Sequence, residues 1–252
     1  MFDITEANPK LGAQLVFTIK KQNDKKPLLV SEIIQTNKRN IMEGYELFAE
    51  NSALEAPTDE ALRVPYYCEE NVWRLGVRKR TQQPFGNRYY AVFISNPIKN
   101  VPMFQQKAAA NGEVSVCWDY HVILLCQQIG DGQASVYDMD SLLPYPCPLD
   151  EYLEHSFPYD WPYPFGPMFR VVPLDLFLNN FGSDRSHMRD KNGGWNAPPP
   201  IYAPIGQQNN LQEYLRFGKS DGPPESDANT NPVYGRIFTK KKLRAADLST
   251  FP

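Results

Sequence analysis

The sequence predicts an α+β fold in which one helix packs on an antiparallel β-sheet. Residues 68–75 read Cys-Glu-Glu-Asn-Val-Trp-Arg-Leu, with acidic residues in the first turn and apolar residues at helical spacing. Three runs rich in Val, Ile, Tyr and Phe follow, at 89–95, 114–126 and 134–138, and turns containing Gly or Asn separate them. A helix followed by consecutive strands favours α+β over an alternating α/β order.

The chain divides into two predicted parts. Its 252 residues, 42% hydrophobic and 22% charged, are ordinary for a globular protein and sufficient for a sizeable core. Residues 1–60 contain β-like runs at 14–19 and 28–34 and a helical-looking run at 42–52, but neither Cys nor His. We therefore expect an N-terminal extension of unknown role over 1–60, and a main domain over 61–252 that carries the chemistry.

Charge and hydropathy exclude several partners. A net charge of -3 provides no broad positive field for phosphates, so we expect no nucleic-acid binding. The basic run Lys240–Lys242 is typical of a solvated surface. Met1–Gly12 lacks an apolar signal core, and no apolar stretch approaches the roughly 20 residues that span a bilayer. We expect a cytoplasmic monomer without membrane contact, with the nucleus as a second location if the source is eukaryotic.

The second half of the main domain is rich in loops. Residues 144–167 are crowded with Pro and aromatic residues, which predicts an ordered loop without long regular elements. Leu174–Phe181 is a predicted short helix that ends before Gly182. A second loop is expected at 192–204.

Cys68 is the strongest candidate nucleophile. A thiol at a helix N-terminus feels the positive end of the helix dipole, which predicts a lowered pKa, although Glu69 and Glu70 oppose this effect. The other cysteines, Cys117, Cys126 and Cys147, lie in β runs or between prolines and are expected to be buried, reduced and structural. The alternative for Cys68 is a core position without chemistry.

His121 is the candidate base, in a strongly β-forming segment. If Gly130–Asp131 forms a two-residue hairpin turn, His121 faces Asp140, and Asp138 lies one diagonal step away on the same side. Either carboxylate could orient the imidazole. Asp119, two residues before His121, shares its face.

Other chemistries lack their patterns. His155 and His187 are scattered without metal-ligand spacing, and the chain has neither a serine-hydrolase elbow nor a phosphate-binding glycine motif. We therefore expect no metal and no cofactor. The segment Ser183–Met188 is dense in hydrogen-bonding groups and is interpreted as a buried polar loop, with a role in lining a site as the alternative.

Five motifs in this order resemble the protein N-terminal glutamine amidohydrolase family: Tyr67–Trp73, Tyr90–Asn96, Trp118–Val122, Tyr137–Asp140 with Leu143–Cys147, and Ser183–Met188. The resemblance runs from about residue 66 to 200 and more weakly to 245. It implies a Cys-His-Asp triad of Cys68, His121 and Asp138, and so selects Asp138 over Asp140. It also implies a papain-like or transglutaminase-like fold, substrates that begin with glutamine, and a product that eukaryotes feed to protein degradation.

The implied reaction forms a γ-glutamyl thioester on Cys68, releases ammonia and hydrolyses the thioester. Selection of an N-terminal residue requires an acceptor for its α-ammonium group. Asp119, Glu70 and Asp140 are the nearest acids, and Asp119 is our choice. A cysteine protease or transglutaminase-like enzyme with the same triad, and a non-catalytic binding module, are the alternatives.

Overall fold

The computed structural model describes residues 58–82, 86–109, 112, 114–130, 132–206, 208–218, 232–246 and 248. The β-like runs and the helix expected before residue 57 lie outside these ranges. The separate extension expected over residues 1–60 therefore stays a prediction, and the described fold belongs to the chain from Thr58 onward.

Helix α2 is followed by six consecutive strands, and short helices and the last two strands complete the described residues. In chain order they are η1 (Asp59–Leu62), α2 (Cys68–Gln82), β1 (Asn87–Ser95), β2 (Val101–Met103), β3 (Val116–Trp118), β4 (His121–Gln128), β5 (Ala134–Tyr137), β6 (Cys147–Pro148), α3 (Leu149–Ser156), β7 (Met168–Pro173), α4 (Leu174–Asn180), η2 (Ser186–Met188), α5 (Leu211–Tyr214), η4 (Pro232–Tyr234), β8 (Arg236–Thr239) and α6 (Lys240–Arg244). None of the described helices combines the length and the apolar character needed to cross a bilayer.

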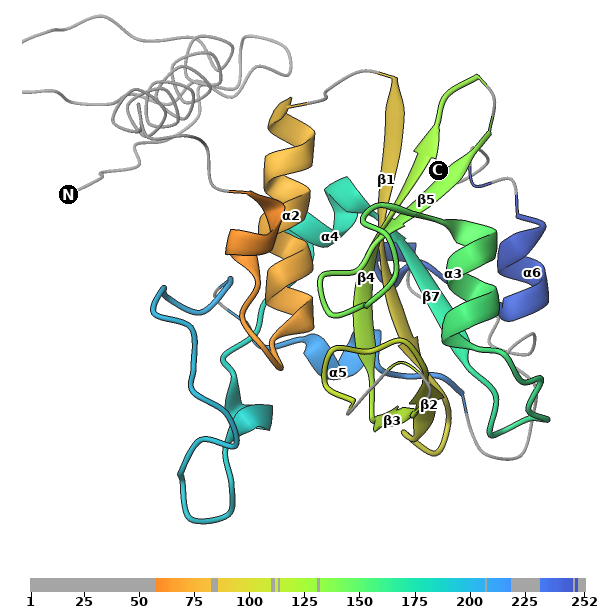
Figure 1. The fold of residues 1–252 in the computed structure, drawn as a ribbon. Helices are drawn as coiled ribbons and strands as arrows, with labels where there is room; N and C mark the ends of the chain where they lie inside the picture. The colour runs from red at the N-terminus through yellow and green to blue at the C-terminus, as the bar shows by residue number, and fades with distance from the viewer. Residues whose placement is uncertain are drawn as a thin grey trace, which may run out of the picture. The chain divides into compact units, whose positions relative to one another are not determined.

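Six strands form one antiparallel sheet, in the order β6-β5-β4-β1-β7-β8. Helix α2 precedes all of these strands, and Figure 1 shows it lying along one face of the sheet. The predicted α+β class is confirmed. The predicted helix at Cys68 and the predicted strands at 89–95 and 134–138 are present, with ends that differ by two residues or fewer except at the helix C-terminus, which was not predicted.

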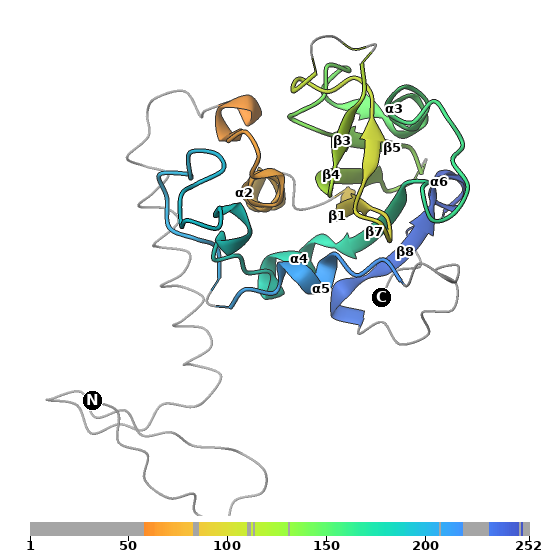
Figure 2. The same ribbon diagram turned by 90° about the horizontal axis from the view of Figure 1, so that it is seen from below.

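Both faces of the sheet are buried. Along β1, Tyr89, Ala91 and Phe93 pack on the side of α2, α4 and α5, while Tyr90, Val92 and Ile94 pack on the side of α3 and α6. This alternation is the period of two that a strand imposes on its side chains. Figure 2 shows the sheet between the two groups of helices. Such burial explains why β1 reads as a continuous apolar run.

The N-terminal half of α2 packs against β4. Val72 and Leu75 of the helix share one apolar cluster with Val122 and Leu124 of the strand. Each of the four side chains is buried almost completely, and burying a side chain of this size stabilises the fold by about 1.5–3 kcal/mol. This contact places the first residue of α2 beside the first residues of β4.

The predicted β run 114–126 is interrupted. Val116–Trp118 pairs with β2 in a separate two-stranded sheet, and β4 begins at His121. Between them, the Asp119 carboxylate accepts a hydrogen bond from the Tyr120 N–H at 2.9 Å, and the Asp119 carbonyl accepts from the Ser95 hydroxyl at 2.6 Å. These local bonds replace ladder bonds, and β propensity alone does not reveal them.

The Pro-rich stretch 144–167 holds more regular structure than predicted. Helix α3 begins directly after Pro148 and ends before Phe157 and Pro158, so the prolines flank the helix and do not interrupt it. Proline is tolerated at a helix start because the first N–H groups have no intrahelical acceptor. The helix predicted over Leu174–Phe181 is confirmed as α4, which ends one residue earlier.

Candidate active site

A cavity of about 240 Å³ lies where α2 begins and β4 begins. Cys68, His121 and Asp119 line it, three of the four residues that the sequence singled out. The other residues of the wall are Tyr66, Ser95, Lys99, Trp118, Tyr120, Asp140, His187, Met188, Asn196, Gln212 and Leu215. Asp138, the fourth predicted residue, contacts His121 without lining the cavity itself.

Cys68 is the first residue of α2, and its side chain is buried. Its thiol donates to Glu69 Oε2 at 3.7 Å, and the backbone N–H of Val122, the residue after His121, hydrogen-bonds the thiolate form. Burial, followed by the charge of Glu69, raises the pKa of the Cys68 thiol well above its ordinary value. The prediction of a lowered pKa is therefore wrong, because desolvation and the nearby carboxylates raise it. The resting thiol is protonated and needs a base.

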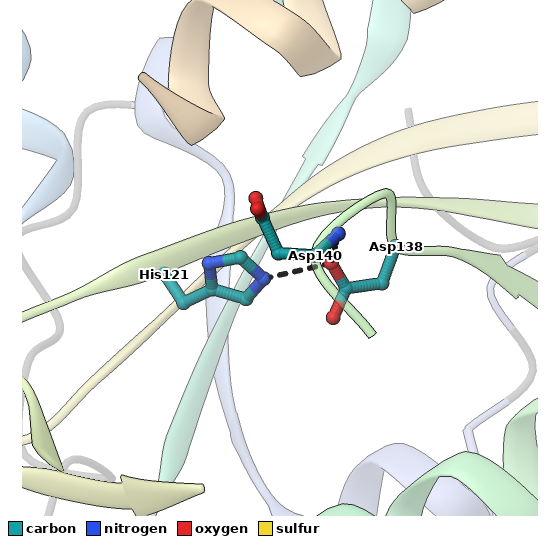
Figure 3. Close-up of side chains that lie close together, drawn as sticks. All are labelled: His121, Asp138 and Asp140. Atoms are coloured by element: carbon teal, nitrogen blue, oxygen red, sulfur yellow. Dashed lines mark hydrogen bonds and ion pairs between the residues drawn. The ribbon is translucent and has the colours of Figure 1, made fainter. Parts of the chain in front are cut away.

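The imidazole of His121 is bound to Asp138. Its Nε2 lies 3.0 Å from Asp138 Oδ1, and both side chains are buried (Figure 3). Burial alone would raise the pKa of Asp138, but the contact with His121 outweighs it and the pKa is lowered. An ionised carboxylate can only accept, so Nε2 carries the hydrogen of the neutral ring. Nδ1 then keeps a lone pair that can accept a proton.

The contact with Asp138 also changes the pKa of His121. Burial by itself lowers the pKa of His121, whereas the charge and the hydrogen bond of Asp138, with smaller contributions from Asp140 and Glu69, raise it further than burial lowers it. The net pKa lies above the ordinary value of 6.5. The ring is therefore a stronger base than a free imidazole, which suits it to take a proton from a buried thiol.

Two residues that the sequence did not indicate hold Asp138. Its Oδ2 accepts from the Tyr152 hydroxyl at 2.9 Å and from Gln106 Nε2 at 3.4 Å. Gln106 also accepts from Trp118 Nε1 at 3.3 Å, and the Trp118 ring stacks on His121 with 6.0 Å between centroids. Tyr152 comes from α3 and Gln106 from a loop, so no spacing in the sequence links them to the site.

The hairpin register was predicted correctly, but it did not decide whether Asp138 or Asp140 binds His121. Leu124 pairs with Tyr137 and Gln127 with Ala134, the register that a turn at 130–131 requires, although Asp131 itself lies outside the described residues. The ladder ends at Tyr137, so Asp140 is not held opposite His121. Local contacts then separate the two acids, because Asp138 bonds the ring and Asp140 bonds Arg63.

A metal ion is a further use for these side chains. One ligand atom each of His121, Asp138 and Asp140 lies within 4.8 Å of the other two. However, Nε2 of the ring and Oδ1 of Asp138 bind each other, and Asp140 Oδ1 accepts from Arg63 Nε and Nη2, both at 2.7 Å. Figure 3 shows the Asp140 carboxylate turned away from the contact between ring and acid. The atoms that could bind a metal are thus already engaged in hydrogen bonds and an ion pair. The expectation of no metal stays a prediction.

The other acids differ in their partners. Glu70 is fully buried and receives two hydrogen bonds from Arg185, at 2.7 and 2.8 Å. Asp140 forms an ion pair with Arg63. Asp119 is exposed on the cavity wall, and within the described ranges it makes no ion pair. Of the three acids considered for the α-ammonium group, Asp119 is therefore the one that forms no ion pair with an arginine of the described residues.

The segment Ser183–Met188 serves both roles that the sequence left open. Arg185 is buried against Glu70 and also donates to the carbonyls of Pro200 and Tyr202, so it ties the following loop to α2. His187 and Met188 line the cavity.

The structural cysteines differ in their exposure. Cys126 and Cys147 are buried as predicted. Cys117 is exposed, so its predicted burial is wrong, because β3 belongs to the small two-stranded sheet.

The chain is similar to curated proteins over this region. A family model described as N-terminal glutamine amidase matches residues 63–246. The protein N-terminal glutamine amidohydrolase of Bos taurus is 43% identical over 173 residues, which cover 66% of this chain and 82% of the relative. That of Homo sapiens is 43% identical over 173 residues (66% and 83%), and that of Oryza sativa subsp. indica is 42% identical over 171 residues (62% and 73%). The chain belongs to the N-terminal glutamine amidase family.

Proposed function

We propose that this chain is a protein N-terminal glutamine amidohydrolase, which converts the side chain of an N-terminal glutamine to glutamate and releases ammonia. Its relatives carry that name, and it spans about four fifths of the Bos taurus and Homo sapiens proteins. The observation that carries the proposal is the shared cavity wall of Cys68 and His121, with His121 bonded to the buried Asp138.

In the first half of the reaction Cys68 is the nucleophile. Sγ attacks the side-chain amide carbon of glutamine while its proton passes to Nδ1 of His121, and Asp138 stabilises the imidazolium through Nε2–H. The tetrahedral intermediate then collapses, the C–N bond breaks, and His121 gives its proton to the departing ammonia. A γ-glutamyl thioester on Cys68 remains.

In the second half water replaces ammonia. His121 takes a proton from a water molecule, whose oxygen attacks the thioester carbon, and the C–S bond breaks to return the proton to Cys68. The Cys68 N–H lies in the first turn of α2, where no intrahelical acceptor exists, so it is placed to stabilise the oxyanion of both steps. The chemistry is complete with these side chains and water, without a cofactor.

We also infer the finer fold type and the setting. A cysteine at the start of a helix that packs on an antiparallel sheet, with histidine and aspartate on neighbouring strands or just after them, supports a papain-like or transglutaminase-like architecture. We take the working form to be a cytoplasmic monomer, and we keep Asp119, which lines the cavity, as the alternative acceptor for the substrate's ammonium group.

The experiment that tests this function compares four peptides by mass spectrometry and ammonia release. We expect the peptide that begins with Gln to gain about one mass unit, as conversion of amide to acid requires. Peptides with internal Gln, with N-terminal Asn, or with no side-chain amide should stay unchanged.

The rival activities give different products. Cleavage of the peptide would indicate a cysteine protease, and a crosslink to an added amine, in excess over hydrolysis, would indicate a transglutaminase. No product from any peptide would indicate a binding module and overturn the proposal.

A further inference from the structure

Glu69 is a buried carboxylate directly behind the nucleophile. Its side chain has no exposed surface, and Oε2 accepts from the Cys68 thiol at 3.7 Å and from the Tyr120 hydroxyl at 3.1 Å. His187 Nε2 lies 3.3 Å from Oε1, yet Oε1 makes no hydrogen bond in the described part of the chain. The triad of Cys68, His121 and Asp138 does not use this group.

Unlike its neighbours, Glu69 has no guanidinium or ammonium partner among the residues that the structure describes. The adjacent Glu70 is neutralised by Arg185, and Asp140 by Arg63. The basic group beside Glu69 is His187, whose Nδ1 is buried without a hydrogen-bond partner in the described ranges. A charged His187 ring would bury a second N–H donor without an acceptor, which disfavours it as a permanent counter-ion. A buried carboxylate without a paired cation is costly, so binding of a cation beside it is favoured.

The geometry of glutamine brings such a cation to this place. The α-nitrogen is four bonds from the amide carbon, roughly 5 Å when the side chain is extended. The amide carbon in turn must approach Sγ to about 3–3.5 Å for attack. The α-ammonium group therefore lies within roughly 8 Å of Sγ, and Glu69 is one of the acids in that range.

Tyr120 and His187 form the wall of the cavity in front of Glu69. Both line the cavity, and the Tyr120 hydroxyl oxygen lies 3.1 Å from His187 Nε2. Because the Tyr120 hydroxyl gives its hydrogen to Glu69, its oxygen accepts from Nε2–H of His187 and keeps a second lone pair for a donor on the cavity side. Burial and the charge of Glu69 raise the pKa of Tyr120, so it stays a neutral hydroxyl.

We propose that the α-ammonium group of the substrate docks on Tyr120 and His187 over the Glu69 carboxylate, and that this cation releases the Cys68 thiol from Glu69 for attack. The proposal rests on the proposed function and names the recognition step within it. Glu69 is a positioning residue, since it acts through Cys68 and Tyr120. In the free enzyme it holds the thiol proton away from His121, and a substrate with a free α-amine neutralises it.

In this arrangement, activation of Cys68 depends on the free α-ammonium group of the substrate. The charged or titratable groups facing the thiol are Glu69 on α2, Tyr120 and His121 at β4, Asp138 and Asp140 after β5, and His187 on η2. Among these, the negative charge of Glu69 makes the largest electrostatic contribution against the thiolate. An acetylated N-terminus or an internal glutamine brings no cation, so Cys68 would stay protonated and unreactive.

The test is the isosteric variant Glu69→Gln, with two readouts. The first is the pH dependence of Cys68 alkylation by iodoacetamide in the free enzyme. Without the carboxylate the thiolate should form at lower pH, and alkylation at pH 7 should be about tenfold faster, the change that one pKa unit gives. A purely structural role for Glu69 would not accelerate alkylation of a folded protein.

The second readout is selectivity for the free α-amine. Three peptides are compared: one that begins with Gln, its N-acetylated form, and its glutaramoyl analogue, which lacks the α-amino group. In Glu69→Gln the KM of the Gln peptide should rise about 10²-fold, as loss of a buried charge partner predicts, and the preference over the other two should largely disappear. Tyr120→Phe, which keeps the Glu69 charge, should raise KM without faster alkylation.

The outcomes separate this proposal from the function itself. If wild-type enzyme deamidates no peptide, the proposed function fails. If wild-type enzyme is selective and Glu69→Gln keeps both its selectivity and its alkylation profile, the function stands and the role of Glu69 is overturned. Loss of selectivity in Asp119→Asn, with Glu69→Gln unchanged, would assign the ammonium group to Asp119. Should Glu69→Gln fail to fold, Tyr120→Phe decides: an unchanged KM overturns the proposal.

Discussion

The role of a base that we propose for His121 depends on the groups that contact its ring. Asp138 fixes the hydrogen on Nε2 and raises the pKa of the ring, while Gln106 and Tyr152 fix Asp138. Cys68 carries a proton at rest, because burial raises the pKa of its thiol. The base must be neutral to take that proton. Activity should therefore rise with pH as His121 loses its proton, with a midpoint above 6.5, the ordinary pKa of histidine.

Replacing Asp138 with asparagine should lower both the rate and this midpoint. The amide of the new side chain can donate to Nε2 and so place the ring hydrogen on Nδ1, which removes the base, and kcat/KM should fall by about 10²–10⁴-fold. Loss of the carboxylate charge should move the midpoint of the residual activity to lower pH, because that charge is what raises the pKa of His121. The pH profile of kcat/KM measures both effects.

Tyr152→Phe is the matched control, since it removes one hydrogen bond from Asp138 and leaves its charge. It should cost about 10- to 10²-fold in kcat/KM, the range that one hydrogen bond to a charged group of about 1.5–3 kcal/mol allows, with little change in the midpoint. A midpoint in Asp138→Asn equal to or above that of the wild type would contradict the assigned role of Asp138.

Among the elements, the loop after α4 depends on one ion pair. Arg185 is buried, joins Glu70 of α2 through two hydrogen bonds, and donates to the carbonyls of Pro200 and Tyr202. The same loop presents His187 to the cavity. The position of one wall of the site therefore depends on a charge pair whose acidic member is fully buried.

Arg185→Met should destabilise the fold by about 3–5 kcal/mol, because it leaves the Glu70 charge buried and unpaired. Urea unfolding measures the change. The double variant Glu70→Leu/Arg185→Met removes both charges and should recover at least about 2 kcal/mol of the loss. A single variant within about 1 kcal/mol of the wild type would show that the pair is not the anchor.

Several elements could be predicted from local sequence, and others could not. The acidic first turn before Val72 marked α2, and the hairpin at 130–131 gave the correct register of β4 and β5. The break at Asp119 depends on a bond from Ser95 of another strand, which no local pattern contains. The pKa of Cys68 was predicted with the wrong sign, since its burial arises from tertiary packing.

At the scale of the molecule, the site is assembled from distant parts of the chain. The sheet brings β4 to the start of α2, α3 supplies Tyr152, and η2 supplies His187. The resemblance to a family could indicate Cys68, His121 and Asp138 because they lie within short motifs. It could not indicate Glu69 as a partner of His187, because that contact spans more than a hundred residues.

Every described residue of the site follows Thr58, and the family model begins to match at residue 63. We therefore predict that a chain lacking residues 1–57 keeps the kcat/KM of the full chain for a Gln-initiated peptide within about threefold, a free-energy difference below about 1 kcal/mol. Steady-state kinetics on both chains measures this. A loss of about 10²-fold in a truncated chain with an unchanged circular dichroism spectrum would assign the extension a part in the reaction.

Ammonia release from a Gln-initiated peptide, by wild-type enzyme and by Cys68→Ala, measures directly whether Cys68 is the nucleophile. We expect one ammonia per peptide converted by the wild type, and a rate lower by roughly 10⁴-fold or more in the variant, because Cys68 supplies the only thiol among the described residues of the cavity wall. A Cys68→Ala variant that releases ammonia at the wild-type rate would contradict it.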